Sequence, residues 1–387
     1  MDYFKHIHHI GLKVAILFFV LPLSSCSDSD AQEADPNPPT ETPNAFYLGT
    51  DLSYVNELED FGATYRKNGN LIDPFTLFSE AGSSMVRVRL WHTPPKGYSD
   101  FEDVKKTMLR AKAAQMETLL DFHYSDFWAD PQKQEIPATW AHITDTEELA
   151  ETVYNYTYNT LEQFRTAGVV PTMVQIGNEI NIEVMQYPGS TPGPINWDRN
   201  STLLQSGLNA VKDFNSNYNT DIQTLLHIAQ PENAFWWFEQ AYQNGLTAFD
   251  IIALSYYPKW SDYSLDQIDT AIASLQTQFG KPVFIVETAY PHSLQNVDNA
   301  NNILGNDALI SGYPATAQGQ LDYLIDLTNE VKNANGLGVL YWEPAWVTSN
   351  TQTAWGEGSH WDNATFFDAF NNNEALPAFE FFDLSNY

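Results

Sequence analysis

Short apolar runs typical of β-strands alternate with longer amphipathic stretches from residue 46 onward. Eight such runs can be distinguished, and their starts lie roughly 28 to 55 residues apart, so each gap can hold a helix. The predicted strands are Tyr47–Asp51, Met85–Trp91, Thr118–Tyr124, Met173–Asn178, Ile222–Ala229, Asp250–Tyr256, Pro282–Glu287 and Gly336–Trp342. Helices are predicted at Phe101–Gln115, Thr146–Ala167, Leu203–Asn215 and Leu265–Phe279. Eight β-then-α units predict an α/β fold, a (β/α)8 TIM barrel, with residues 46–387 as one domain.

The N-terminal segment has the pattern of a lipoprotein signal. Lys5 and Lys13 precede an apolar run, Val14 to Leu23, that is too short to span a bilayer. The run ends in Leu23-Ser24-Ser25-Cys26, which resembles the lipobox of bacterial lipoproteins, where cleavage precedes the cysteine and the cysteine carries the lipid. We interpret residues 1–25 as a signal peptide and Cys26 as the lipidation site. A plain signal peptide with a chance cysteine is the alternative.

Residues 26–45 are rich in acidic residues and proline, which is typical of an extended spacer. The acidic stretch after the cysteine, Ser27-Asp28-Ser29-Asp30, resembles an export signal for the outer cell surface in some Gram-negative bacteria. The sequence therefore predicts a secreted lipoprotein, held in the outer membrane through Cys26 and facing the cell surface. An ordinary soluble tether would have a similar composition.

The charge balance restricts the partners of the chain. It carries 18 basic and 49 acidic residues, a formal net charge of -31, which argues against nucleic acid and acidic polysaccharides as ligands. The sequence also contains 11 Trp and 20 Tyr. Aromatic faces pack on the C–H faces of pyranose rings, so these residues favour a neutral glycan, although core packing accounts for many of them. Cys26 is the only cysteine, which excludes an intrachain disulfide. We expect a monomer.

Polar and aromatic residues follow seven of the eight predicted strands. In a (β/α)8 barrel, these carboxyl ends of the strands carry the active site. Two of these residues, Glu179 and Glu287, close the fourth and seventh strands, which lie nearly opposite each other in a barrel of eight. Retaining cleavage of a glycoside needs two carboxyl groups, one that attacks the anomeric carbon and one that protonates the leaving oxygen. Asn178, which precedes Glu179, carries an amide that can hold the sugar 2-hydroxyl. This chemistry needs no cofactor.

The order of Asn-Glu after strand four and Glu after strand seven resembles glycoside hydrolase clan A. Longer strings resemble glycoside hydrolase family 53, the endo-β-1,4-galactanases, over about residues 46–385. The matching stretches are Gly49–Ser53, Val86–Trp91, Asp121–Pro131 with Gln134, Gln175–Glu179, Ser255–Trp260, Val286–Pro291, Gln318–Gln320, Tyr341–Trp346 and Trp361–Asn363. The Trp-Ala-Asp-Pro and Tyr-Trp-Glu-Pro-Ala-Trp strings are specific, whereas Asn-Glu alone is shared by the whole clan.

The resemblance implies retaining endo-hydrolysis of β-1,4-galactosidic bonds in galactan and the type I arabinogalactan side chains of pectin. It assigns the acid/base role to Glu179 and the nucleophile role to Glu287. It also implies that Arg89 orients the nucleophile and lowers its pKa. The residues expected to contact the sugar are Asp51, Arg89, Trp91, His123, Asn178, Tyr256, Trp342 and Trp346, with Trp128 and Trp260 as further candidates.

An Asn- and Asp-rich stretch, residues 296–302, follows the seventh strand. Carboxylate and amide oxygens at alternate positions can wrap Ca²⁺, and bacterial members of the family often bind Ca²⁺ in this loop together with a Ser-x-x-Asp. The predicted ligands are Asn296, Asp298, Ala300, Asn302, Ser359 and Asp362. The loop is less acidic than is usual in the family, which would weaken a structural calcium ion. An Asn-rich turn without an ion is the alternative.

Two other functions fit parts of the pattern. A clan A barrel could act on another β-1,4-glycan, namely cellulose, mannan or xylan, with the same carboxyl pair. A non-catalytic lipoprotein that binds glycans at the cell surface is the second alternative, but such a protein would be expected to lose one catalytic residue. Asn178, Glu179 and Glu287 are all present. A metal hydrolase has little support, because the chain contains no H-E-x-x-H string.

Overall fold

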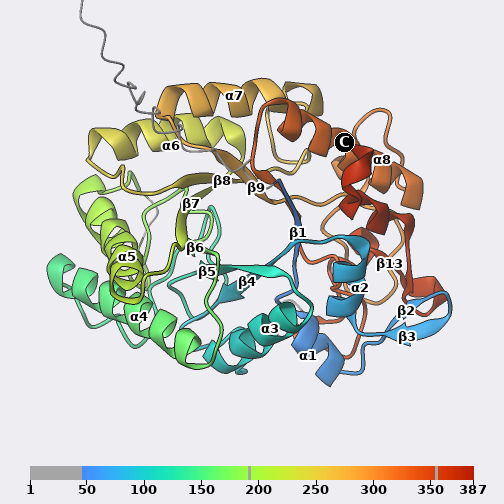
Figure 1. The fold of residues 1–387 in the computed structure, drawn as a ribbon, viewed down its shortest axis with the longest axis horizontal. Helices are drawn as coiled ribbons and strands as arrows, with labels where there is room; N and C mark the ends of the chain where they lie inside the picture. Colours follow the sequence, from blue (N-terminus) through green and yellow to red (C-terminus); the bar gives the residue numbers. More distant parts are fainter. Residues whose placement is uncertain (1–45, 191–192, 354–355) are drawn as a thin grey trace, which may run out of the picture. The chain divides into compact units, whose positions relative to one another are not determined.

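Eight parallel strands close into a barrel in the computed structural model, which describes residues 46–190, 193–353 and 356–387 (Figure 1). The order around the barrel is β1 (Tyr47–Asp51), β10 (Gly338–Tyr341), β9 (Val283–Glu287), β8 (Ile251–Ser255), β7 (Gln223–Ala229), β6 (Met173–Ile176), β5 (Glu117–Phe122) and β4 (Met85–Leu90). Parallel pairing of β1 with β4 completes the ring. All eight strands predicted from the sequence are present, with ends shifted by one or two residues, so the predicted (β/α)8 fold is confirmed.

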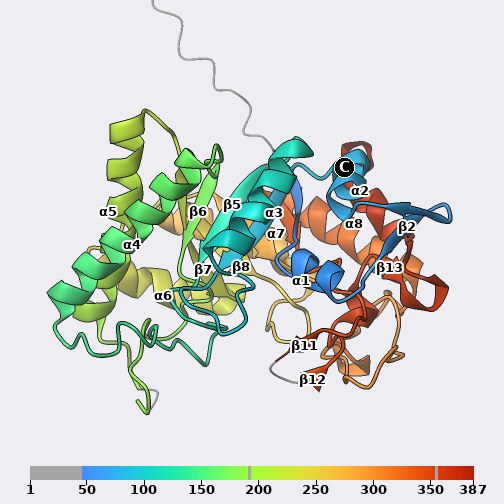
Figure 2. The ribbon, with the colours of Figure 1, turned by 90° about the horizontal axis from the view of Figure 1, so that it is seen from below.

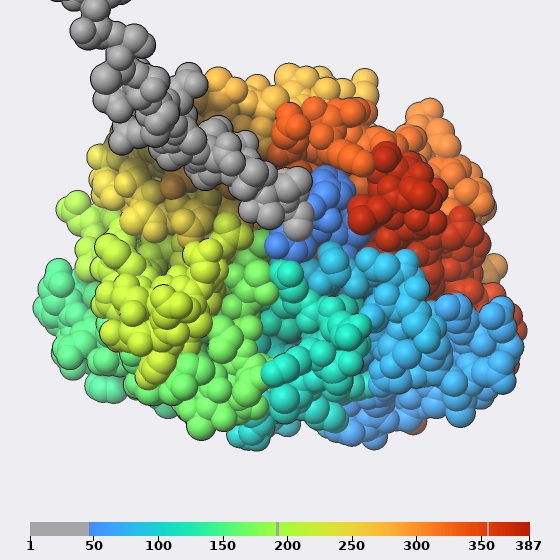
Figure 3. All heavy atoms as spheres, in the orientation of Figure 1, coloured from blue at the N-terminus to red at the C-terminus, as the bar shows by residue number. Residues whose placement is uncertain are grey.

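Helices surround the barrel and follow its strands in turn. They are α1 (Val55–Asp60), α2 (Pro74–Ala81), α3 (Phe101–Ala113), α4 (Thr146–Thr166), α5 (Trp197–Tyr218), α6 (Pro231–Gln243), α7 (Ile268–Phe279) and α8 (Ala317–Asn333). Short polar side chains fix several starting points: Asp100, Asp145 and Asn196 each accept a hydrogen bond from the backbone N–H three residues later. Consecutive units are neighbours, so the colours run in chain order around the surface in Figure 3.

The C-terminal tail packs against the segment between β1 and β4. Strands β13 (Phe367–Asp368) and β14 (Glu374–Ala375) form a small sheet with β2 (Tyr65–Lys67) and β3 (Asn70–Ile72). Phe366 and Phe382 are fully buried there. Gly82 has φ +109, and a Cβ at this position would lie 2.5 Å from the carbonyl oxygen of Phe382. Only glycine allows this close approach between α2 and the tail.

The barrel interior has an apolar layer below a polar one. The apolar layer contains Met85, Leu119, Met173, Leu225, Ile251, Ala253, Phe284, Val286, Leu337 and Leu340. Alternate residues of a strand point to the same side, so the residue two positions further along enters the barrel nearer its carboxyl end. On five strands this residue is polar: Arg87, Asp121, Gln175, His227 and Ser255. On these five strands, the side chains inside the barrel change from apolar to polar toward the carboxyl end. The end of the barrel that carries an active site therefore has a polar floor.

The loops at this end of the barrel come from distant parts of the sequence. Figure 2 shows the hairpin of β11 (Gln352–Thr353) and β12 (Gly356–Glu357) at the same end as the long loop that follows β9. In the described part of the chain, no helix is long and apolar enough to cross a membrane. The predicted signal peptide, the lipidation site Cys26 and the linker lie outside the described residues.

Candidate active site

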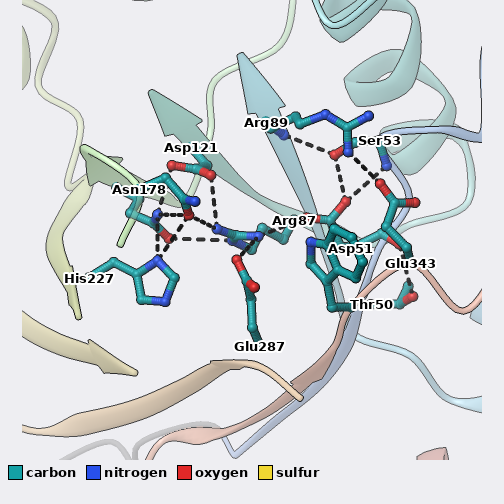
Figure 4. Close-up of polar contacts among 12 residues, drawn as sticks. Thr50, Asp51, Ser53, Arg87, Arg89, Asp121, Asn178, His227, Glu287 and Glu343 are labelled. Carbon is teal, nitrogen blue, oxygen red and sulfur yellow. Dashed lines mark hydrogen bonds and ion pairs between the residues drawn. The ribbon is translucent and has the colours of Figure 1, made fainter. Parts of the chain in front are cut away.

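Arg87 is the centre of a buried ionic network at the carboxyl end of the barrel (Figure 4). Its Nη1 lies 2.9 Å from an oxygen of Asp51 and 2.8 Å from Oε1 of Glu287. Its Nη2 donates to Asp121 and to Oδ1 of Asn178, both at 2.8 Å. One guanidinium group thus ties together four strand ends. Its contacts fix the position of Glu287 relative to Asn178, the neighbour of Glu179.

Glu287 is held through both of its carboxyl oxygens. Arg87 pairs with Oε1, and the hydroxyl of Tyr257 donates to Oε2 at 3.1 Å. Burial raises the pKa of Glu287 to about 7, against the opposing effect of the Arg87 cation and the hydrogen bond from Tyr257. Both partners stabilise the carboxylate form, and both restrict its rotation. A carboxylate fixed in this way suits a nucleophile, because its attacking oxygen is aimed before the substrate arrives.

Glu179 follows β6 in a left-handed backbone conformation, with φ +43, which is unusual for a residue with a side chain. This turn directs its half-buried carboxyl toward β8, where the Ser255 hydroxyl donates to Oε1 at 2.6 Å. Burial and the negative charge of Glu287 together raise the pKa of Glu179 to about 8. The cationic Arg87 acts in the opposite direction, but less strongly.

The two carboxyl groups therefore differ in their protonation. Each titrates under the influence of the other, and the pair as a whole releases its protons in two steps. Arg87 and Tyr257 favour loss of the first proton from Glu287. Glu179 keeps its proton to higher pH, because burial and the ionised Glu287 both oppose a second negative charge. One acid and one carboxylate in the same site are the requirement for retaining cleavage of an acetal bond.

The side chain of Asn178 has four polar neighbours, one of which is Nδ1 of His227, 3.0 Å from its Oδ1. Its Oδ1 accepts hydrogen bonds from Arg87 and Gln175, and its Nδ2 donates to the carbonyl oxygen of Ala129 at 2.8 Å. The amide group is therefore fixed with its oxygen directed into the network. Contact between Asn178 and a sugar hydroxyl stays a prediction.

Aromatic side chains form one wall of the site. Trp342 and Trp128 are half-buried, and their ring centroids lie 5.8 Å apart. His123 lies behind them, with Nε2 3.0 Å from Asp121 and with Nδ1 accepting from the indole N–H of Trp91 at 3.2 Å. The partly exposed rings remain candidates for sugar stacking. The buried positions of His123 and Trp91 fit a role in orienting that wall, while direct sugar contact by either stays a prediction.

The predicted role of Arg89 at the nucleophile is wrong. Arg87, and not Arg89, pairs with Glu287. Arg89 instead pairs with the fully buried Glu343, at 2.5 Å, and its guanidinium lies 4.0 Å from the ring centroid of Tyr54 and 4.5 Å from that of Trp128. It is only 2% exposed, so its charge supports the aromatic wall from behind. Glu343, which sequence reasoning did not assign, provides the counter-charge.

Three further residues predicted to contact the sugar are buried among protein groups, and their contact with a sugar stays a prediction. Tyr256 is fully buried and donates its hydroxyl to the carbonyl oxygen of Tyr263, whereas its neighbour Tyr257 faces the site. Asp51 is fully buried, and its oxygens accept hydrogen bonds from Ser53 and Arg87. Trp346 is 1% exposed and packs on Tyr54 with 4.3 Å between the ring centroids.

The calcium prediction has no support from the structure. The residues in question are Asn296, Asp298, Ala300, Asn302, Ser359 and Asp362. Within residues 46–190, 193–353 and 356–387, no three His, Cys, Asp or Glu side chains converge as a metal-binding group. The loop brings Asp298 and Asp362 together, but the hydroxyl of Thr348 donates to both. Backbone N–H groups and the Asn302 amide also donate to these two carboxylates, while Oδ1 of Asn302 is buried without a hydrogen-bond partner among the described residues.

A closed parallel barrel with carboxyl groups at the ends of two nearly opposite strands fits the class of glycoside hydrolases. The comparisons with known proteins give the family. The model of glycosyl hydrolase family 53 matches residues 47–382, and the chain belongs to that family.

Characterised relatives cover most of the chain. An arabinogalactan endo-β-1,4-galactanase from Cellvibrio japonicus is 57% identical over 339 residues, which is 87% of this chain and 90% of the relative. An endo-β-1,4-galactanase from Bacillus subtilis is 35% identical over 321 residues, which is 80% of this chain and 72% of the relative. The solved family 53 catalytic domain from Ignisphaera aggregans superimposes with a TM-score of 0.80 at 32% identity, covering 90% of this chain and 98% of that chain.

Tyr257 and Tyr256 provide a matched test of the site geometry. We expect Tyr257→Phe to lower kcat roughly 10- to 100-fold, because it removes a hydrogen bond to the charged form of Glu287. Since that bond lowers the pKa of Glu287, its loss should move the acid limb of the pH–rate profile to higher pH. Tyr256→Phe should cost about 1 kcal/mol of stability and leave kcat unchanged. Steady-state kinetics across pH, with thermal unfolding, test both; equal kcat losses would contradict the assignment.

Proposed function

We propose that this chain is a retaining endo-β-1,4-galactanase that cleaves galactan and the type I arabinogalactan side chains of pectin. The observation that carries the proposal is the carboxyl pair, in which Arg87 and Tyr257 stabilise ionised Glu287 while burial favours protonated Glu179. Membership of family 53 and the activities named for the relatives from C. japonicus and B. subtilis support galactan as the substrate. Glu287 is then the nucleophile and Glu179 the acid/base.

In the first step, a carboxylate oxygen of Glu287 attacks the anomeric carbon and forms a glycosyl ester. The bond to the glycosidic oxygen breaks, and its electron pair goes to that oxygen, which takes the proton of Glu179. Arg87 and Tyr257 hold Glu287 at the start of the step. The partial positive charge of the sugar ring develops beside the buried acidic network around Arg87, which favours this transition state.

In the second step, Glu179 is a carboxylate and takes a proton from water. The oxygen of that water attacks the anomeric carbon, the ester bond breaks, and Glu287 leaves as a carboxylate. Once Glu287 is esterified, its negative charge no longer raises the pKa of Glu179. That pKa therefore falls, and Glu179 can be the ionised base that this step requires. Two inversions at one carbon give a product with retained anomeric configuration.

The substrate is tested by the release of reducing ends from unbranched β-1,4-galactan, cellulose, mannan and xylan. We expect cleavage of galactan alone, with a fall in viscosity that precedes the release of short products, as endo cleavage requires. The Glu287→Gln variant controls for contaminating activity. Cleavage of another glycan would keep the carboxyl mechanism and refute the substrate. If the wild type binds galactan but does not cleave it, the hydrolase proposal is refuted. A non-catalytic glycan-binding lipoprotein then becomes the better interpretation.

We also propose that the mature protein begins at Cys26 and is anchored by a lipid on the cell surface. The lipobox-like string and the acidic residues after it support this location. In a Gram-negative expression host, the full chain should partition with detergent and the Cys26→Ser variant with the aqueous phase. Equal partition of the two would refute the anchor, without bearing on the hydrolase.

A further inference from the structure

Two residues absent from the roles above form a chain of contacts to the acid/base. Ser255, at the end of β8, donates its hydroxyl to Oε1 of Glu179 at 2.6 Å. His227, on β7, places its Nε2 2.9 Å from the Ser255 oxygen. On the other side of the ring, the backbone N–H of Glu179 donates to Nδ1 of His227 at 3.3 Å. The contacts begin and end at Glu179, and both His227 and Ser255 are fully buried.

The directions of these hydrogen bonds follow from the number of protons available. Ser255 has one hydroxyl hydrogen, and an ionised Glu179 can only accept it. His227 must then donate from Nε2 to the serine oxygen. With a neutral ring, its Nδ1 then carries no hydrogen: the N–H donors of Glu179 and Gln175 face it, and Oδ1 of Asn178 lies 3.0 Å away. Burial lowers the pKa of His227 well below its ordinary value, and the charge of Arg87 acts in the same direction, so the ring stays neutral.

We propose that His227 and Ser255 are positioning residues for the acid/base: they keep the Ser255 hydroxyl donating to Oε1 and so reserve Oε2 of Glu179 for the catalytic proton. Oε1 is the oxygen of Glu179 with a side-chain partner among the described residues. A proton on Oε1 would face the serine hydrogen, whereas a proton on Oε2 is free to reach the glycosidic oxygen. This inference rests on the acid/base role proposed for Glu179.

The chain of contacts also sets how strongly Glu179 holds its proton. Three charged groups and one hydroxyl act on the pKa of Glu179 from the surrounding elements. Glu287 on β9 and Asp130 after β5 raise its pKa, while Arg87 on β4 and the Ser255 hydroxyl lower it. His227 on β7 is neutral and acts only through Ser255. Ser255 is therefore the uncharged group that stabilises the carboxylate needed in the second step.

The direct test is the titration of Glu179 followed by the carboxyl ¹³C signal of labelled glutamate in the Glu287→Gln background, which removes the coupled titration. We expect Ser255→Ala to raise the midpoint by about one pH unit, because a hydrogen bond to the charged form is lost. Ser255→Thr, which keeps the hydroxyl, should restore it. In the active enzyme, Ser255→Ala should move the alkaline limb of kcat/KM to higher pH by a similar amount.

Thr328→Ala is the matched control, because it removes a buried hydroxyl that donates within α8, away from the site. It should leave the alkaline limb unchanged. The ¹⁵N signals of His227 should show a proton on Nε2 throughout the titration of Glu179. A proton on Nδ1, or an unchanged midpoint in Ser255→Ala, would overturn the inference. These NMR signals need no substrate, so the test does not depend on whether galactan is the glycan cleaved. If Ser255→Ala does not fold, the tautomer of His227 can still be measured in the Glu287→Gln protein.

Discussion

Replacing Glu287 with glycine is expected to lower galactan cleavage by roughly 10⁵-fold, because no other carboxylate can form the glycosyl ester. The fold should survive the change, since Arg87 keeps its ion pairs with Asp51 and Asp121. The cavity left by the side chain can admit azide, which can attack the anomeric carbon once. With an aryl β-galactoside chain that carries a good leaving group, the variant should then release an α-galactosyl azide. Product configuration by NMR is the measurement.

The matched variant is Glu179→Ala with the same substrate and azide. Here Glu287 still forms the ester, azide replaces water in the second step, and the product should be the β-galactosyl azide. Opposite configurations from the two variants would assign the roles individually. A β-azide from Glu287→Gly, or near-normal cleavage by that variant, would exchange the roles or refute the pair. Circular dichroism of both variants separates a chemical effect from unfolding.

The barrel and the carboxyl pair could be predicted because each depends on local sequence. Strand β9, for example, is a continuous apolar run, Val283 to Val286, that ends in Glu287. A strand that is buried on both faces can be predicted from its own continuous apolar run, without knowledge of the strands that pair with it. The residue that follows the run must lie at the carboxyl end of the barrel. The Asn178-Glu179 pair after β6 is found in the same way.

The choice between neighbouring residues was harder, and the reason differs between the two tyrosines and the two arginines. Ser255 points into the barrel, so the side-chain period of two would have favoured Tyr257 over Tyr256 as the residue that faces the site. The choice between Arg87 and Arg89 could not be made by period, because both point inward from β4. The two arginines pair with different residues, Glu287 and Glu343, because they lie at different positions along the barrel axis. Those positions depend on the register between neighbouring strands, which the sequence pattern does not give.

The loop after β9 shows a different limit. Its Asn and Asp residues fit a calcium loop by type and spacing, but the position of hydrogen-bond donors around each oxygen is not contained in that pattern. Thr348 donates to both Asp298 and Asp362. It lies about fifty residues after Asp298, so a local sequence motif could not identify it. In the same way, His227 had no motif of its own, because its contacts to Ser255 and to the backbone of Glu179 join three strands.

Arg87→Met is expected to have the largest effect on stability. It removes the one cation shared by Asp51, Asp121 and Glu287, and it leaves buried carboxylates without a counter-charge. Breaking a buried pair in this way costs about 3–5 kcal/mol. Because Arg87 lowers the pKa of Glu287, that pKa should rise further in the variant. The native state then binds protons more readily than the unfolded chain, so the stability of the variant should increase as pH falls toward the unfolded-state value of Glu.

Arg89→Met is the control, because Arg89 is buried to the same degree but pairs with Glu343. It should also be destabilised, yet the acid limb of its pH–rate profile should match that of the wild type, since Arg89 makes no contact with Glu287. In Arg87→Met the acid limb should move to higher pH. Urea unfolding at several pH values and kcat/KM profiles of both variants are the measurements. If the two variants shift the acid limb equally, the network around Arg87 does not set the ionisation of the nucleophile, and burial alone must account for it.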